Sequence, residues 1–282
     1  MSIHSTLSPI DTGRPDRLRF GASSAYECAD ESSDRWELLR RHGDFTLAYS
    51  ACHQDGLKYF GDRDGVIAYA QHLGYTFALG DPITSDANRA ALIERFISSI
   101  RDCSFVQIGD KTASVLDGLG YRINGMGVDS IIHLNEFSFQ GKRKERYRYA
   151  YNWLGTHGYR CFESSLCDVG RPRLRRLSLA WRKTRPIRKR EVGFLNRPMV
   201  FRDEVDTRKF FLSDASGRLF AFIGLDPVYR DGQIVGYVTT FKRRDPEGPG
   251  YSEQGLMKFI IDRLQEEGRQ ELHLGLSLPW PT

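Results

Sequence analysis

GKRKERYRYAYNWLGTHGYRCFE, residues 141–163, combines a basic helix with a following strand and sets the fold class of the second half of the chain. Apolar residues at i, i+3, i+4 and i+7 predict one face of a helix over 142–155, namely Tyr147, Ala150, Tyr151 and Leu154. The run 159–163 is predicted as a strand. Leu174, Leu177 and Trp181 predict a second helix over 172–184.

Similar patterns continue on both sides of this stretch. Helical spacing predicts helices over 33–42, 86–101, 111–119 and 253–267. Short runs rich in aromatic and branched residues predict strands at 45–50, 57–61, 66–73, 75–79, 104–108, 121–124, 130–134, 209–213, 219–225, 234–240 and 271–276. Each half combines antiparallel meanders with helices, which predicts an α+β fold. The order of helices and strands is that of an acyltransferase-like unit, which the chain would contain twice.

The predicted division of the chain has three parts. Residues 1–18 are polar and contain Pro9, Gly13 and Pro15, so we expect a disordered tail. Residues 19–140 and 141–282 are the two expected domains. Residues 193–208 form an irregular connection, either a surface loop or the border of an active-site cleft.

Positive charge is concentrated between residues 141 and 190. This segment has sixteen Lys and Arg against three Asp and Glu, a net +13, while the whole chain carries only +5. Such a segment is either a solvated surface or a binding site for a polyanion, and the polyanion would be a nucleic acid or an anionic membrane. The aromatic residues among the charges argue against a disordered tail, and they either anchor the helices in a core or stack on bases. We expect the cations of both helices to hold one polyanionic ligand.

Several reaction classes are excluded by missing motifs. The chain has no GxxxxGK[ST], GxGxxG, HExxH or GxSxG sequence, and it lacks the glycine-rich pyrophosphate loop of acetyl-CoA acetyltransferases. Five widely spaced cysteines without a CxxC pair indicate reduced thiols, not a zinc site. We predict no cofactor and no metal. No apolar run is long enough to cross a bilayer, and no signal peptide is evident.

Four motifs in order point to one family. They are LGDPIT (79–84), the GKRKERYR segment within 135–160, TTFKRRDPEGPG (239–250) and LHLGLSLPW (272–280). With them the chain resembles the C-terminal catalytic domain of the lysylphosphatidylglycerol synthetase (MprF) family, as a soluble member without the transmembrane flippase. The resemblance covers residues 35–280. The positions that match the family pattern are Asp81, Lys142, Arg146, Arg243 and Gly275.

The resemblance implies two tandem GNAT-like units with a cleft between them. It also implies transfer of an amino acid from aminoacyl-tRNA to a hydroxyl or amine acceptor, typically phosphatidylglycerol. Where membrane-bound members carry acidic residues, this chain has Thr240 and Lys258, so the resemblance does not name the amino acid.

Candidate site residues follow from this chemistry, which needs an oxyanion stabiliser and help with proton movement. The catalytic candidates are Arg243, Asp81 and Glu253, although a capping or surface role is open for both carboxylates. The candidates for tRNA or phosphate binding are Lys142, Arg143, Arg146, Arg173, Arg176 and Arg244. The candidates for substrate binding are Lys111 and Gly275.

The expected partners are aminoacyl-tRNA and an anionic lipid or small-molecule acceptor. Two alternatives remain open, an acyl-CoA-dependent acyltransferase and a non-catalytic binder of RNA or anionic membrane. We expect a cytoplasmic protein, and peripheral contact with the inner face of the cell membrane is a further alternative.

Overall fold

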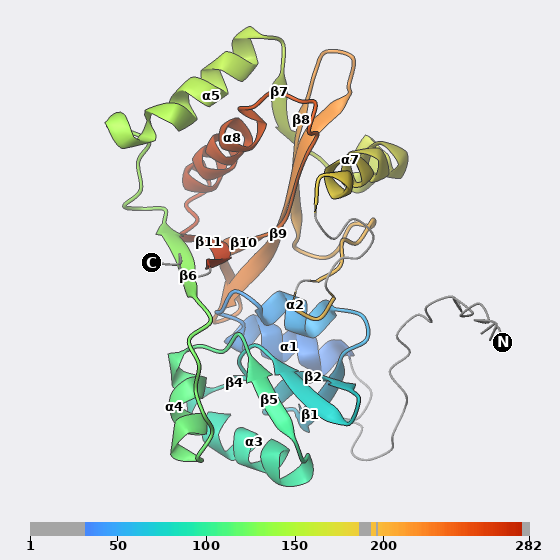
Figure 1. Cartoon of the computed structure of the whole chain (residues 1–282). Coiled ribbons are helices and arrows are strands. Elements are labelled where there is room, and N and C mark those ends of the chain that lie inside the picture. Colours follow the sequence, from blue (N-terminus) through green and yellow to red (C-terminus); the bar gives the residue numbers. More distant parts are fainter. Residues whose placement is uncertain (1–31, 186–192, 196, 278–282) are drawn as a thin grey trace, which may run out of the picture.

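The protein is described by a computed structural model that covers residues 32–185, 193–195 and 197–277. In this part of the chain two β-sheets, each with its own helices, lie one above the other (Figure 1). The predicted tail, residues 1–18, lies outside the described residues.

The first sheet is built around an antiparallel meander. Its strands are β1 (Lys58–Asp62), β2 (Gly65–His72), β3 (Tyr75–Leu79), β4 (Ile83–Thr84) and β5 (Cys103–Val106). The strand order is β1-β2-β3-β5, and β4 pairs with β2. β5 is parallel to β3 because helix α3 (Asp86–Ser99) crosses between them.

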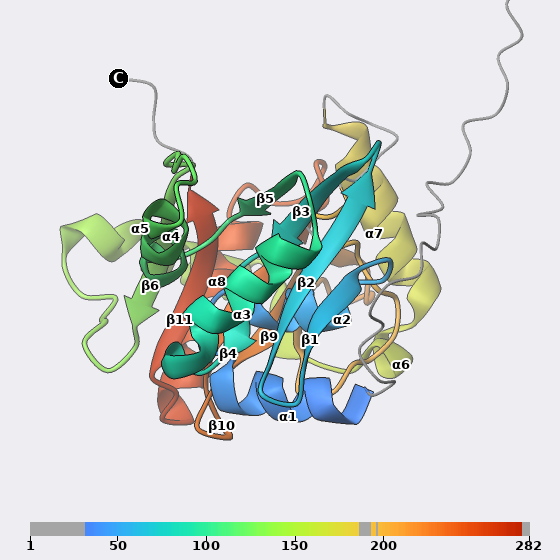
Figure 2. The ribbon, with the colours of Figure 1, turned by 90° about the horizontal axis from the view of Figure 1, so that it is seen from below.

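Helices cover both faces of the first sheet. They are α1 (Ser32–His42), α2 (Ala48–His53), α3 and α4 (Asp110–Gly118). Side chains alternate along β2, so Val66 and Ala68 pack against α1 and α2 while Ile67 and Tyr69 pack against α3. Figure 2 shows α3 crossing the face of the sheet that lies away from the second half.

The second sheet is larger and has the strand order β6-β11-β10-β9-β8-β7. Its strands are β6 (Val128–His133), β7 (Arg160–Glu163), β8 (Arg208–Ser213), β9 (Leu219–Arg230), β10 (Gln233–Arg244) and β11 (Glu271–Ser277). Only β10 and β11 pair in parallel among these strands; the other pairs are antiparallel.

Helices also cover both faces of this sheet. A 3-10 turn η1 (Lys142–Lys144) leads into α5 (Glu145–Thr156), and α6 (Leu166–Val169), α7 (Arg171–Lys183) and α8 (Ser252–Glu266) follow. α5 and α8 pack on the face that carries Phe210 and Leu212, whereas α7 packs on the face that carries Phe211 and Phe222. α7 therefore lies on the opposite side of the sheet from α5 and α8 (Figure 1).

The two halves share an order of elements. Each has helices at its start, then three antiparallel strands, a crossing helix and a strand parallel to the last of the three. In the second half β7 and α6 stand between the first helices, α5 and α7. This confirms the predicted α+β fold with two mostly antiparallel mixed sheets. β6, however, pairs with β11 and so belongs to the second sheet. The chain therefore passes from the first sheet to the second between α4 and β6, before the predicted division at residue 140.

Two predicted strands are wrong. Residues 45–50 enter helix α2, because Phe45, Ala48, Tyr49 and Cys52 are spaced i, i+3, i+4 and i+7 and turn inward together. Residues 121–124 have no regular structure, although the Tyr121 ring packs edge-on against Phe105 at 6.5 Å. The other predicted helices and strands are confirmed within a few residues at their ends, apart from β9, which runs on to Arg230.

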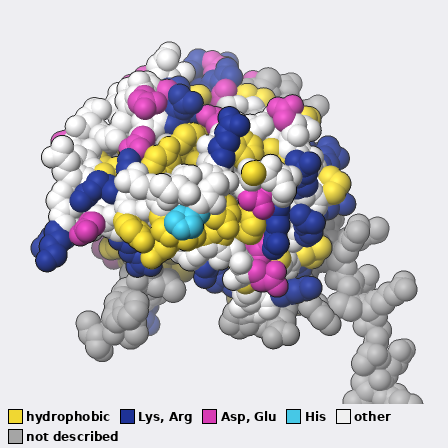
Figure 3. Space-filling view, turned by 90° about the horizontal axis from the view of Figure 1, so that it is seen from above, with side chains coloured by type: hydrophobic (Ala, Val, Ile, Leu, Met, Phe, Trp, Pro, Cys, Tyr) yellow, Lys and Arg dark blue, Asp and Glu magenta, His cyan; other side chains and the backbone are white. Residues whose placement is uncertain are grey.

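The surface of the second half is mixed in character. Seen from above, hydrophobic side chains group around a histidine, and Lys and Arg side chains lie at the border of the group (Figure 3). In the part of the chain that the structure describes, no helix has the length and apolar character needed to span a membrane.

Candidate functional site

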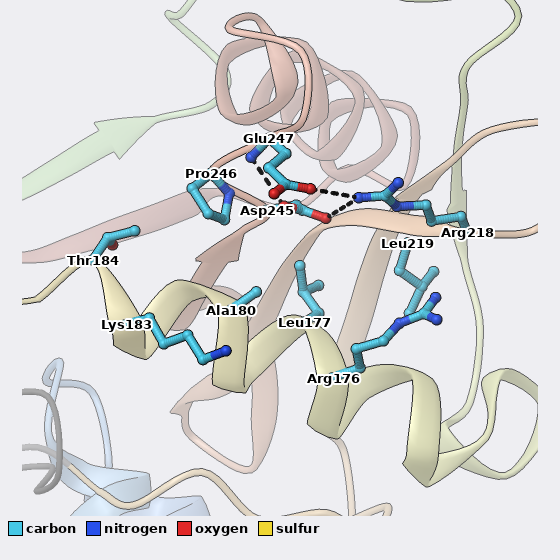
Figure 4. A pocket seen from close by; sticks show the side chains of 10 residues that line it. All are labelled: Arg176, Leu177, Ala180, Lys183, Thr184, Arg218, Leu219, Asp245, Pro246 and Glu247. Atoms are coloured by element: carbon cyan, nitrogen blue, oxygen red, sulfur yellow. Dashed lines mark hydrogen bonds and ion pairs between the residues drawn. The ribbon is translucent and has the colours of Figure 1, made fainter.

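A cavity of about 400 Å³ opens beside α7 (Figure 4). One wall is the helix itself, and the other is the start of β9 together with the connection that follows β10. The residues that line it are Arg176, Leu177, Ala180, Lys183, Thr184, Arg218, Leu219, Asp245, Pro246 and Glu247. We call this cavity the α7 groove.

The sequence of α7 explains why its cations line the groove. Leu174, Leu177 and Ser178 are buried against the sheet, so the arginines between them must point away from the core. Pro172 in the first turn suits a helix start, and Gly170 before it has φ 88°, which favours glycine. Arg176 and Lys183 project from the helix at the groove and make no ion pair with any described residue.

The opposite wall carries both signs of charge. Arg218 donates a hydrogen bond to Asp245 at 2.9 Å and lies 3.5 Å from Glu247. Asp245 is 9% exposed and also accepts the backbone N–H of Glu247, which fixes the turn after β10. The charge of Arg218 is thus partly neutralised, and Arg176 and Lys183 remain to attract an anion.

Arg243 and Trp181 extend the groove towards the end of α7. The Arg243 guanidinium lies 3.9 Å from the centroid of the Trp181 ring, and the Arg185 guanidinium lies 4.3 Å from the same ring. A guanidinium held over an indole ring is pre-oriented, so it binds a phosphate or carboxylate with little loss of side-chain freedom. Arg244 follows on the same strand and is exposed.

A second polar cluster joins the two halves. Arg197 is 5% exposed and donates to both carboxylate oxygens of Glu204, at 2.8 and 2.9 Å, and to Asp226 at 2.8 Å. Its guanidinium also lies 5.2 Å from the ring of Tyr49 on α2 and 5.6 Å from the ring of Phe241 on β10. One arginine therefore links the irregular connection, the second sheet and the first half.

Burial controls ionisation in this cluster. It raises the pKa of the Asp226 carboxyl, while Arg197 and the Thr240 hydroxyl act in the opposite direction. Burial, reinforced by Arg197 and Arg35, lowers the pKa of His53 to about 4, so this imidazole is neutral near pH 7. The ion pairs of Arg197 compensate most of the buried charge, which is what a packed joint between two halves requires.

The structure gathers four of the predicted phosphate-binding and catalytic residues at one place. Arg176 lines the α7 groove, Arg243 and Arg244 lie at the end of β10 beside it, and Arg173 projects from the same helix towards the β8–β9 turn at Gly217.

The other three predicted phosphate contacts lie elsewhere. Lys142, Arg143 and Arg146 are on η1 and α5, across the sheet from α7 (Figure 1). The expectation that both basic helices hold one ligand stays a prediction. Because the two apolar stripes pack on opposite faces of the sheet, such a ligand would have to reach around the sheet to contact both helices.

The remaining candidates are dispersed. Both carboxylate oxygens of Asp81 accept the backbone N–H of Gly109, at 3.0 and 3.2 Å, and so cap the start of α4. Lys111 pairs with Asp86, whose pKa is lowered by hydrogen bonds from Lys111 and Arg89.

Glu253 is exposed in the first turn of α8. Gly275 lies at a bulge in β11 with φ 87°. Asp81 and Lys111 belong to the first half, away from the groove.

Arg197 and Asp226 were not among the sequence candidates. Arg197 lies in the irregular connection, where no periodicity marks it. Asp226 did leave a signal, because it is a single carboxylate within the apolar run LFAFIGLDPVY (219–229), and a charged residue there is buried only with a partner.

Comparisons with known proteins point to one family. The sequence profile described as phosphatidylglycerol lysyltransferase, C-terminal, matches residues 36–278. The phosphatidylglycerol lysyltransferase of Staphylococcus xylosus is 25% identical over 200 residues, which is 66% of this chain and 23% of that protein. The one from Bacillus subtilis is 20% identical over 251 residues, 85% of this chain and 28% of that protein. The chain thus spans about a quarter of the length of these relatives.

Solved structures support the fold. The structure of L-PGS from Bacillus licheniformis superposes with a TM-score of 0.79 at 19% identity, covering 92% of this chain and 80% of that one. FemX superposes with a TM-score of 0.59 at 10% identity, covering 90% of this chain and 89% of that one.

Proposed function

Because the chain belongs to the family described as phosphatidylglycerol lysyltransferase, C-terminal, we propose that it is an aminoacyltransferase. The donor is aminoacyl-tRNA and the acceptor is a lipid hydroxyl, first of all that of phosphatidylglycerol. The observation that carries the proposal at the level of the site is the α7 groove, where Arg176 and Lys183 have no ion pair among the described residues. Beside it the Arg243 guanidinium lies over the Trp181 ring. An anionic donor is attracted to such a surface.

The reaction is transfer of an activated ester. The acceptor oxygen attacks the aminoacyl carbonyl carbon, the bond to the tRNA 3′ oxygen breaks, and the proton of the acceptor hydroxyl passes to the leaving oxygen. Negative charge develops on the carbonyl oxygen, and Arg243 is the residue that we assign to stabilise it or to hold the adjacent phosphate. Since the ester is already reactive, positioning supplies much of the remaining rate.

Two carboxylates were candidates for moving the proton. The oxygens of Asp81 are engaged by Gly109 in the first half, which leaves Glu253, exposed at the start of α8. By this elimination we propose Glu253 for the proton-handling role; it follows the connection after β10, whose first residues, Asp245 to Glu247, line the groove. Replacing it by Gln should lower kcat more than it changes KM for aminoacyl-tRNA.

The proposal is tested with total aminoacyl-tRNA that carries labelled amino acids, mixed with phosphatidylglycerol vesicles and the purified protein. We expect label in the lipid extract. Label that stays on the tRNA, with none in the lipid extract and none in aqueous products freed of tRNA, would overturn the proposal. Label in a tRNA-free aqueous product alone would replace the lipid by a soluble acceptor.

Binding of tRNA can be assigned to one side of the sheet. The double variant Arg176→Ser and Lys183→Ser removes two cations from the α7 groove, so the slope of log affinity against log salt should become shallower by about 1.5. Arg143→Ser with Arg146→Ser removes two cations across the sheet and is the matched control, whose slope should stay that of the wild type. Equal changes of this slope in both variants would show that tRNA does not bind the α7 groove in preference to α5.

An acyl-CoA-dependent acyltransferase is the second candidate, and the parting of β10 and β11 favours it. The two strands pair only from Gly236–Glu271 to Val238–His273, although β10 continues to Arg244 and β11 to Ser277. Parted strand edges offer backbone groups to an extended ligand that contains amides, as pantetheine does. Release of free thiol from acetyl-CoA in the presence of candidate acceptors would support this candidate.

A further inference from the structure

Five aromatic side chains form a connected cluster on the outer side of α5. The Trp153 ring stacks on His157 with centroids 3.9 Å apart and lies 6.2 Å from Tyr159, nearly parallel to it. Tyr251, just before α8, is tilted against Trp153 at 5.4 Å and meets Tyr149 at 5.3 Å. We call these residues, Tyr149, Trp153, His157, Tyr159 and Tyr251, the aromatic face.

The aromatic face is accessible to a partner. Tyr149 is 52% exposed and His157 is exposed, whereas the other three rings are half-buried. Helix α5, which carries Tyr149 and Trp153 and has His157 at its C-cap, lies at the upper end of the molecule (Figure 1), and hydrophobic side chains gather on that end (Figure 3). The rings contact one another, two pairs stacked, one tilted and one edge-on.

Cations border the aromatic face. Arg146, Tyr149 and Trp153 are spaced i, i+3 and i+7 on α5 and so lie along one stripe of the helix. Lys142, Arg143 and Arg160 are exposed nearby in sequence, so that with Arg146 there are four cations against the three exposed acids Glu145, Glu247 and Glu253. The border is thus positive on balance.

We propose that the aromatic face docks on an anionic lipid bilayer, with its rings at the level of the headgroups and Arg146 and its neighbours on the lipid phosphates. Tyr and Trp, with an apolar ring and a polar tip, suit this layer, and basic residues add attraction to anionic lipid. RNA is the less suitable partner, because base stacking needs a free ring face and the Trp153 ring is already stacked. The inference rests on the proposed function, in which the acceptor is a membrane lipid.

One buried ring, that of Phe220, links the aromatic face to the α7 groove. Tyr159 meets Phe220 edge-on at 5.3 Å, and the Arg218 guanidinium lies 4.9 Å from the Phe220 ring. Arg218 in turn lines the groove. Docking through the aromatic face would therefore bring lipid headgroups to the edge of the groove, while tRNA binds along α7.

Co-sedimentation of the full chain with vesicles tests the proposal. The protein should bind vesicles of phosphatidylglycerol and phosphatidylcholine more tightly than vesicles of phosphatidylcholine alone. The double variant Arg146→Ser and Tyr149→Ser should weaken binding to the anionic vesicles by roughly tenfold. Both side chains are exposed, so the fold should tolerate the change.

The control variant removes exposed apolar residues at another place. Leu73 and Tyr75, 84% and 60% exposed at the β2–β3 turn, can be replaced by Ser together, and vesicle binding should stay at the wild-type level. Equal binding by wild type and the Arg146/Tyr149 variant would overturn the proposal. Loss of tRNA binding by that variant, with vesicle binding intact, would assign the face to RNA and overturn it as well.

A transfer assay separates this inference from the proposed function. With a short-chain phosphatidylglycerol that is dispersed as monomers, the Arg146/Tyr149 variant should transfer label as fast as the wild type. With vesicles it should be slower, roughly in proportion to the lost binding. Absence of transfer by the wild type to either substrate would contradict the proposed function, while the vesicle-binding result would still decide on docking.

Discussion

At the scale of single residues, Arg197 is a buried cation that contacts both halves of the chain. It lies in the connection before β8 and contacts Tyr49 of the first half. It pairs with Glu204 in the same connection and with Asp226 on β9. A guanidinium can serve several partners at once because its five donors lie in a fixed plane. Arg218 carries the same charge at the surface, where its side chain is 43% exposed and is solvated by water.

Replacing Arg197 tests this contrast. Arg197→Leu would leave Asp226 and Glu204 buried without their cation, and we expect a loss of about 3–5 kcal/mol in the free energy of unfolding. Arg218→Leu breaks an exposed pair and should cost about 1 kcal/mol or less. Urea unfolding measures both, and similar losses in the two variants would show that the Arg197 cluster does not join the halves.

At the scale of elements, packing separates the two basic helices. α5 and α7 are close in sequence and similar in composition, yet α5 packs with α8 on one face of the second sheet while α7 packs on the other. Strand β7 and the short helix α6 carry the chain around the edge of the sheet between them. This arrangement is what allows tRNA and lipid to be assigned to different surfaces.

The pairing of β10 with β11 depends on a glycine. A Cβ at Gly236 would lie 2.1 Å from the carbonyl oxygen of Glu271, which is backbone and cannot turn aside. Gly236→Ala should therefore lower the free energy of unfolding by about 1–3 kcal/mol. The control is Gly155→Ala in α5, where the added methyl meets no atom within 4 Å and should raise stability by up to about 1 kcal/mol. Thermal unfolding in which the Gly236 variant matches the wild type would refute this account.

At the scale of the whole molecule, the halves share a core. The Tyr229 side chain of β9 is buried with Leu38, Leu39 and Tyr49 of the first half, and Thr46 hydrogen-bonds to the buried His273 of β11 at 2.8 Å. The backbone N–H of Tyr229 also donates to the carbonyl oxygen of Gly43. Relative movement of the halves would expose these apolar and polar groups together.

The first expected domain, residues 19–140, is consequently incomplete by itself. It would carry β6 without its partner β11 and helices α1 and α2 without Tyr229. We expect this fragment to show no cooperative unfolding transition by circular dichroism, whereas the full chain unfolds in one step. A fragment with a sharp transition and a dispersed NMR spectrum would establish two independent domains instead.

The sequence by itself determined the periodic elements, the α+β class and the family. Apolar spacing in α3, α5, α7 and α8 marks a face that must be buried, and this is a property of neighbouring residues. Even α2, predicted as a strand, carries the helical spacing at Phe45, Ala48, Tyr49 and Cys52. Of the candidate site, the cations Arg176, Arg243 and Arg244 could be named from motif and charge alone.

Only the tertiary structure decided which candidates meet. It placed α5 and α7 on opposite faces of one sheet, gave Asp81 to the start of α4, and buried Arg197 between Glu204 and Asp226. The physical reason is that local periodicity fixes which side of a helix is buried but not against which surface. That choice depends on strand order and chain crossing, which are set by contacts between residues far apart in the chain.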